Sequence, residues 1–165
     1  MRFARHTAGG RAATDLILTT FRANGVFLHA GDRLVADDAM TAARWQVLGA
    51  IALADRPLTV AQIARRMGLA RQSVHTTVRR LVGDGLLELV DNVDHRRSPL
   101  VRMTRTGEAA YEAVDHKQAA WADRLADGID PADMEAAERV LRELCRRLEA
   151  GTATTTTETT TERPT

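Results

Sequence analysis

The chain has 165 residues, of which 44% are hydrophobic and 27% charged, and its formal net charge at pH 7 is +1. This length and composition suit one small folded domain with additional helices, and they exclude collagen-like and wholly disordered chains. No segment approaches the roughly 18 apolar residues of a membrane helix, and no apolar stretch follows the basic N-terminus, so neither a membrane span nor a secretory signal is expected.

The first third of the chain predicts two helices. A flexible N-terminus is expected over 1–13, and a helix over 14–37 has Leu18, Phe21, Gly25 and Leu28 on one face. Gly25 and Gly31 would each weaken an isolated helix by roughly 1 kcal/mol, so packing against a partner must sustain it, and a turn at these glycines is the alternative. Another helix begins at Thr41 and ends at residues 56–57, an Arg-Pro pair.

Residues 59–87 predict two short helices around a tight turn. Thr59 is placed to cap the first helix with Gln62 as its reciprocal partner, and Gly68 ends that helix. Ala70 is a poor N-cap for the second helix. Apolar stripes are expected to bury one face of each helix: Leu58, Ile63, Met67 and Leu69 in the first, and Val74, Val78 and Leu81 in the second. The pattern is that of a helix-turn-helix.

The opposite face of the second helix carries side chains that can read DNA bases. Arginine pairs with guanine, glutamine pairs with adenine, and serine or threonine pairs with several base edges. The candidate residues are Arg71, Gln72, Ser73, His75, Thr76, Arg79 and Arg80. For this helix alone, a solvated amphipathic helix is the alternative.

A basic hairpin follows the helix pair. Strands are expected over 86–90 and 100–103, and the loop between them carries His95, Arg96 and Arg97, which suit phosphates or a minor groove. A solvated hairpin is the alternative for the loop alone. Nine arginines lie between residues 65 and 105, against four acidic residues. Together these features predict a winged helix-turn-helix over 41–104, with a recognition helix at about 71–83 and a wing at about 92–98.

Two further helices are predicted over 105–150. Thr104 caps the first, and Asp130 with Pro131 begins the second. Each carries an apolar seam, formed by Tyr111, Val114, Gln118, Trp121 and Leu125 and then by Met134, Ala137, Leu141, Leu144 and Leu148. The seams need partners, so dimerisation through the first and last helices is expected, with an intramolecular core as the alternative. The Thr-rich tail over 151–165 is expected to be disordered.

At these residues the chain resembles the MarR family of winged helix-turn-helix transcriptional regulators, in the segments TAARWQVLGAI, TVAQIARRMGLARQSVHTTVRRLVGDGLL and DHRRSPLVRMTRTG. The resemblance implies a mainly α fold with a small two- or three-stranded antiparallel wing and N- and C-terminal dimerisation helices. It also implies a homodimeric repressor that binds a palindromic operator in double-stranded DNA and is released by a small aromatic effector.

The family's pattern also assigns particular positions. Its recognition helix falls on Arg71 to Leu81 and its wing arginine on Arg97, although family wings often read Asp-x-Arg-Asp-x-Arg and only Arg97 agrees here. By the same analogy a ligand pocket would be lined by Phe21, Leu28, Trp45, Leu48 and Tyr111. Plain core is the alternative role for these five residues.

Other classes of function find less support in the sequence. There is no glycine-rich phosphate loop, nucleophile elbow or pair of metal ligands at helical spacing, so neither an enzyme nor a cofactor or metal site is predicted. The single cysteine, Cys145, excludes an intramolecular disulfide, and a cytoplasmic location is predicted. The remaining alternative is a winged-helix protein-interaction module without specific DNA binding, which the low net charge and the weak Ala70 cap would suit.

Overall fold

The computed structural model describes residues 6–38 and 40–158. The chain divides into two compact units, Met1–Ala119 and Ala120–Thr165, and the boundary lies within helix α5 (Arg105–Ala126). Each unit is considered by itself below.

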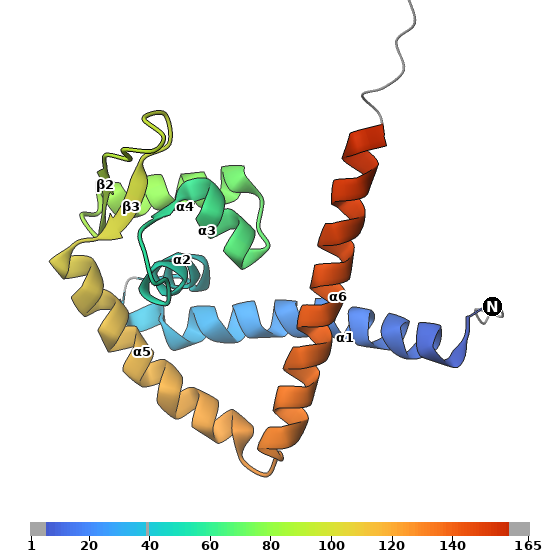
Figure 1. The fold of residues 1–165 in the computed structure, drawn as a ribbon. Coiled ribbons are helices and arrows are strands. Elements are labelled where there is room, and N and C mark those ends of the chain that lie inside the picture. The colour runs from blue at the N-terminus through green and yellow to red at the C-terminus, as the bar shows by residue number, and fades with distance from the viewer. Residues whose placement is uncertain (1–5, 39, 159–165) are drawn as a thin grey trace, which may run out of the picture. The chain divides into compact units, whose positions relative to one another are not determined.

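The first unit is mainly helical with a small antiparallel sheet (Figure 1). Its elements before α5 are α1 (Ala8–Leu34), η1 (Ala36–Asp38), α2 (Ala42–Ala52), β1 (Leu58–Thr59), α3 (Val60–Met67), α4 (Arg71–Gly83), β2 (Leu87–Val90) and β3 (Leu100–Met103). The strand order is β1-β3-β2, so Val101 at the centre pairs with Leu58 on one side and Leu89 on the other. The predicted fold class, mainly α with a small antiparallel wing, is confirmed.

One core joins the helix pair, the sheet and the start of α5. Its largest fully buried side chains are Leu48, Ile63, Leu81, Leu87, Val35, Val47, Val74, Val78, Val101 and Val114. Gly107 in the first turn of α5 lies so close to the backbone of Leu86 that an added Cβ would be 2.0 Å from the Leu86 carbonyl oxygen. A glycine is therefore required where α5 leaves the sheet.

Several predicted boundaries were wrong. α1 begins at Ala8, where Thr7 caps it, and not at residue 14, and it ends at Leu34. It runs without a break through Gly25 and Gly31, as predicted, and the alternative of a turn at these glycines is excluded. At Gly31 an added Cβ would lie 3.2 Å from the Ala42 Cβ, so this glycine permits the close approach of α1 and α2 instead of ending the helix. α2 ends at Ala52, before the predicted Arg-Pro stop. Leu69, predicted to be buried with the first stripe, is 45% exposed because it follows the turn.

The second unit consists of the end of α5 and α6 (Pro131–Glu158). Asp130 caps α6 as predicted, since its Oδ1 accepts from the Ala132 N–H at 2.9 Å. α6 continues to Glu158, so the structure has helix where disorder was expected from residue 151, and residues 159–165 of the predicted tail lie outside the described part of the chain. Residues 1–5 of the predicted flexible N-terminus lie outside it too.

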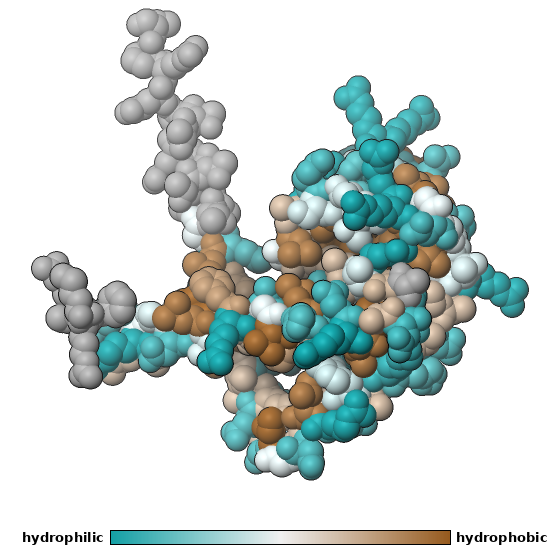
Figure 2. All heavy atoms as spheres, turned by 180° about the vertical axis from the view of Figure 1, so that it is seen from behind, coloured by the Kyte–Doolittle hydropathy of each residue, from teal (hydrophilic) through white to brown (hydrophobic). Residues whose placement is uncertain are grey.

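Apolar side chains remain at the surface of both units. On α1 and α6 these include Ile17, Leu18, Phe21, Val26, Phe27, Met134, Val140 and Leu148. Figure 2 shows apolar side chains among polar ones on the surface seen from behind. Within the described ranges, no helix has the length and apolarity needed to cross a membrane.

Candidate nucleic-acid interface

The helix-turn-helix is formed by α3, a short turn and α4. Thr59 and Gln62 make a capping box, in which Thr59 Oγ1 accepts from the Gln62 N–H at 3.3 Å and Gln62 Oε1 accepts from the Thr59 N–H at 2.8 Å. Gly68 ends α3 with a φ of 64°, a left-handed conformation that favours glycine. α4 then begins after Ala70, which makes no side-chain cap. These local signals act as the sequence predicted.

α4 is fixed against the core by one face, and its other face is free. Val74, Val78 and Leu81 are fully buried, as predicted. Arg44 on α2 donates to Asp84 at the C-cap of α4, with Nη2 and Oδ2 2.5 Å apart, which ties the end of α4 to α2. The seven residues predicted for base reading are all exposed, namely Arg71, Gln72, Ser73, His75, Thr76, Arg79 and Arg80.

Five of these seven side chains line a shallow hollow of about 340 Å³ on the outer side of α4, namely Gln72, His75, Thr76, Arg79 and Arg80. Thr76 Oγ1 donates to the Gln72 carbonyl oxygen at 3.1 Å, so its hydroxyl hydrogen is engaged within the helix. Its methyl group and an oxygen lone pair are what it can offer to a partner.

The wing is a loop with a fixed base. Asn92 is buried at that base, where its Nδ2 donates to the Ser98 carbonyl oxygen at 2.8 Å. The Ser98 N–H in turn donates to the His95 carbonyl oxygen at 2.8 Å. Arg96 and Arg97 are exposed on the loop that these bonds close. These hydrogen bonds therefore hold the backbone of the loop that carries Arg96 and Arg97.

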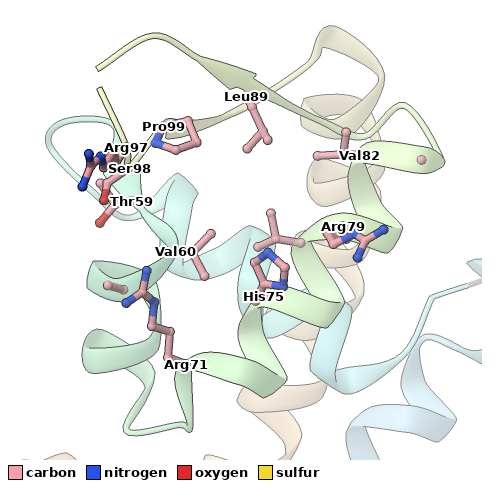
Figure 3. Close-up of a pocket in the computed structure, with 13 residues that line it drawn as sticks. Thr59, Val60, Arg71, His75, Arg79, Val82, Leu89, Arg97, Ser98 and Pro99 are labelled. Carbon is pink, nitrogen blue, oxygen red and sulfur yellow. The ribbon is translucent and has the colours of Figure 1, made fainter. Parts of the chain in front are cut away.

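A cleft of about 460 Å³ separates α4 from the wing (Figure 3). Arg71, His75 and Arg79 line it from α4, and Arg97 lines it from the wing. Four predicted residues from the two elements thus share one cleft. Ser73 and Arg96 line neither the cleft nor the outer hollow.

Ion pairing separates these cations from the arginines of β3 and α6. Over residues 6–38 and 40–158, no ion pair is found for Arg71, Arg79, Arg80, Arg96 or Arg97. By contrast, Arg102 on the outer side of the sheet pairs with Glu88 at 2.8 Å, and α6 pairs its arginines with Glu135, Glu138 and Glu143. The unpaired guanidinium groups of α4 and the wing are available to phosphates and base edges.

A second cavity, of about 660 Å³, lies within the first unit between α1, α2, the end of α3 and α5. Leu28, Trp45 and Tyr111 line it, as the sequence analysis expected. Leu48 does not line it, because this residue is fully buried in the core, and neither does Phe21, which is 70% exposed.

The sequence analysis missed the polar residues of this cavity. They are Asn24, Gln46, Arg66, Asp115 and Gln118. Tyr111, Asp115 and Gln118 follow one another at helical spacing on α5, a signal that could have pointed to a polar wall. Burial, followed by the charge and hydrogen bond of the Asp115 carboxylate, raises the pKa of Tyr111.

Comparisons with known proteins support the same features. The model of the MarR family matches residues 40–98, which hold α2, the helix-turn-helix and most of the wing loop. An uncharacterized protein of Mycobacterium tuberculosis is 38% identical over 135 residues, which cover 82% of this chain and 93% of that protein. The transcriptional activatory protein BadR of Rhodopseudomonas palustris is 29% identical over 107 residues, which cover 62% of this chain and 59% of BadR.

A solved structure supports the fold. The crystal structure of CouR from Rhodococcus jostii, bound to p-coumaroyl-CoA, superposes with a TM-score of 0.70 at 19% identity and covers 80% of this chain and 92% of CouR. At this identity the likeness concerns the fold alone.

Proposed function

Because the chain belongs to the MarR family of DNA-binding transcriptional regulators, we propose that it is a homodimeric repressor that binds a near-palindromic operator through α4 and the wing. The observation that carries this proposal is the set of exposed arginines, unpaired within the described residues, on α4 and the wing loop. In this arrangement α4 enters the major groove and reads base edges, and the wing contacts the backbone or an adjacent minor groove.

The two contact sets have different roles. Arg79 and Gln72 on the outer face of α4 would make paired hydrogen bonds to guanine and adenine, each contributing about 1–3 kcal/mol of discrimination. Arg96 and Arg97 on the wing would neutralise phosphates, which adds affinity without sequence preference and makes binding fall as salt rises. Specificity therefore depends on α4 and much of the total affinity on the wing.

Dimerisation is supported by apolar surface that the single chain leaves uncovered. α6 has no buried residue within the described part, and Leu148 is 70% exposed. On α1, Phe21 is exposed to the same extent. A two-fold dimer would cover such residues on both helices and would place two copies of α4 about 34 Å apart, one turn of the duplex. The operator would then contain two half-sites related by a dyad.

An aromatic effector is proposed to occupy the cavity between α1, α2, α3 and α5. Trp45 and Tyr111 supply aromatic walls, and Arg66 and Asp115 supply one charge of each sign. CouR, a protein of the same fold, was solved with p-coumaroyl-CoA. Arg66, Met67 and Leu69 come from α3 and its turn, so an occupant of the cavity would contact the helix-turn-helix. Its binding would then change the affinity for DNA by a coupling free energy of about 1–3 kcal/mol.

Selection of bound sequences from random duplexes tests the DNA-binding proposal with the purified chain. The expected result is a near-palindrome with half-sites about 10 base pairs apart. Recovery of unrelated sequences whose binding disappears in moderate salt would contradict the proposal and favour the protein-interaction module. Placing the selected duplex in a reporter promoter then tests repression, which predicts lower expression when the protein is present.

A further inference from the structure

Thr76 lies at the centre of the exposed face of α4. Gln72 lies one turn before it, and Arg79 and Arg80 lie one turn after it. Together with His75, these residues line the hollow of about 340 Å³ on the outer side of the helix. A residue at this position meets a base edge when α4 lies in the major groove.

The hydroxyl hydrogen of Thr76 is engaged within the helix. Thr76 Oγ1 donates to the Gln72 carbonyl oxygen at 3.1 Å, one turn back along α4. A hydroxyl group has one hydrogen, so while this bond holds, Thr76 cannot donate to N7 or O6 of guanine, N7 of adenine or O4 of thymine. The side chain is left with its methyl group and with the acceptor capacity of its oxygen.

The methyl group is the more distinctive of these two features. Gln72 already brings an accepting amide oxygen to the same hollow, whereas none of the other four lining side chains has a methyl group. In the major groove only thymine presents an apolar group, its C5-methyl. Contact between two methyl groups removes apolar surface of both from water, which the polar ends of the other side chains cannot do.

We propose that Thr76 reads one thymine in each half-site through the C5-methyl group of the base, an assignment that rests on the DNA-binding function proposed above. Four residues of helix span about 6 Å and one base-pair step spans about 3.4 Å, so this thymine lies within about two base pairs of the base that Gln72 contacts. Removing one of the two contacting methyl groups weakens binding about fourfold for each half-site.

A deoxyuridine scan tests this contact, because uracil differs from thymine only in lacking the methyl group. Each thymine of the selected duplex is replaced in turn at symmetry-related positions of both half-sites, and fluorescence anisotropy measures the affinity of the full chain. We expect one position at which the wild type loses about fifteenfold. Thr76→Ser, which keeps the hydroxyl group, should bind the thymine duplex about fifteenfold more weakly and show no further loss with uracil at that position.

Two further variants separate the methyl group from the hydroxyl group and from general effects on α4. Thr76→Val removes the oxygen but keeps a methyl group, so it should keep the preference for thymine over uracil. Thr77→Ser is the matched control, because Thr77 Oγ1 donates to the Ser73 carbonyl oxygen at 3.2 Å in the same manner, but Thr77 does not line the hollow. This variant should lose as much affinity with uracil as the wild type does. Circular dichroism shows whether each variant is folded.

Three results would overturn the inference. They are a scan in which no thymine can be replaced with loss of affinity, a Thr76→Ser protein that still shows the full loss with uracil, or a Thr76→Val protein that no longer distinguishes thymine from uracil. Any of these results in a chain that selects a near-palindrome leaves the proposed function intact. A chain that selects no sequence would contradict the proposed function itself and, with it, the reading of thymine.

Discussion

Asn92 closes the wing by donating from Nδ2 to the Ser98 carbonyl oxygen at 2.8 Å, while its Oδ1 accepts from the Asp94 N–H at 3.2 Å. Asn92 is 8% exposed, and both ends of its amide are hydrogen-bonded. At the corresponding position the family wing pattern often has aspartate, which cannot donate to a carbonyl when ionised. Asn92 therefore closes this wing with a hydrogen bond that an ionised aspartate could not donate.

Asn92→Ala should weaken DNA binding about tenfold, because it leaves two backbone groups without partners and loosens the loop that carries Arg97. The loss should be similar for specific and non-specific duplexes, and fluorescence anisotropy of labelled DNA measures it. Val93→Ala serves as the control, since Val93 is 96% exposed in the same loop. Equal affinities for the two variants would contradict the role of Asn92.

Gly107→Ala should destabilise the fold by at least about 2 kcal/mol, because its Cβ would meet the Leu86 carbonyl oxygen and displace backbone. Gly9→Ala is a matched control in the first turn of α1, where no atom lies within 4 Å of the added Cβ. Urea denaturation of both variants gives the two changes in free energy of unfolding. A Gly107→Ala protein as stable as Gly9→Ala would show that α5 does not start against Leu86.

Tyr111 is the only tyrosine of the chain, so phenolate absorbance at 295 nm reports its titration directly. Burial and the Asp115 carboxylate raise its pKa above the ordinary value of 10.0. The neutral phenol therefore favours the folded state below pH 10, and this stabilisation is lost as pH rises through the raised pKa. Asp115→Asn should lower that pKa, and an unchanged titration curve would exclude Asp115 as a cause.

Leu148→Asp should weaken dimerisation about a hundredfold, since a two-fold interface contains the substituted residue twice and would bury a charge at each copy. Sedimentation velocity over a range of protein concentrations measures the change. The control Val93→Asp adds the same charge at an exposed apolar residue of the wing and should remain dimeric. A wild-type chain that is monomeric at every concentration would exclude the homodimer altogether.

The helix-turn-helix could be predicted because its signals are local. The Thr59–Gln62 capping box and the left-handed Gly68 act within three residues of the helix ends, and the burial of Val74 and Val78 follows from their spacing. The nine predicted DNA-binding side chains are exposed. Helical spacing turns seven of them away from the buried stripe of α4, and the other two lie in the wing loop. Their roles remain predictions.

The cavities could be predicted only in part, because they depend on how distant segments meet: family analogy placed Leu28, Trp45 and Tyr111 at one of them but also Phe21 and Leu48, which do not line it. Leu48 and Trp45 lie one turn apart on α2, yet Leu48 faces the core and Trp45 lines the cavity. The apolar residues that line the cleft between α4 and the wing, such as Val60 and Leu89, have the local pattern of ordinary core residues. The helical extent of α6 to Glu158 was missed because threonine has a low helix propensity.

The most direct test of the account compares affinities for a selected duplex and a shuffled duplex of the same composition, at physiological salt, for the wild type and Arg79→Ala. We predict that the wild type prefers the selected duplex by a factor of about a thousand or more. Arg79→Ala should reduce this ratio about tenfold while leaving the affinity for the shuffled duplex within about threefold of the wild type. A wild-type ratio near one, or an Arg79→Ala protein with an unchanged ratio, would contradict sequence reading by α4.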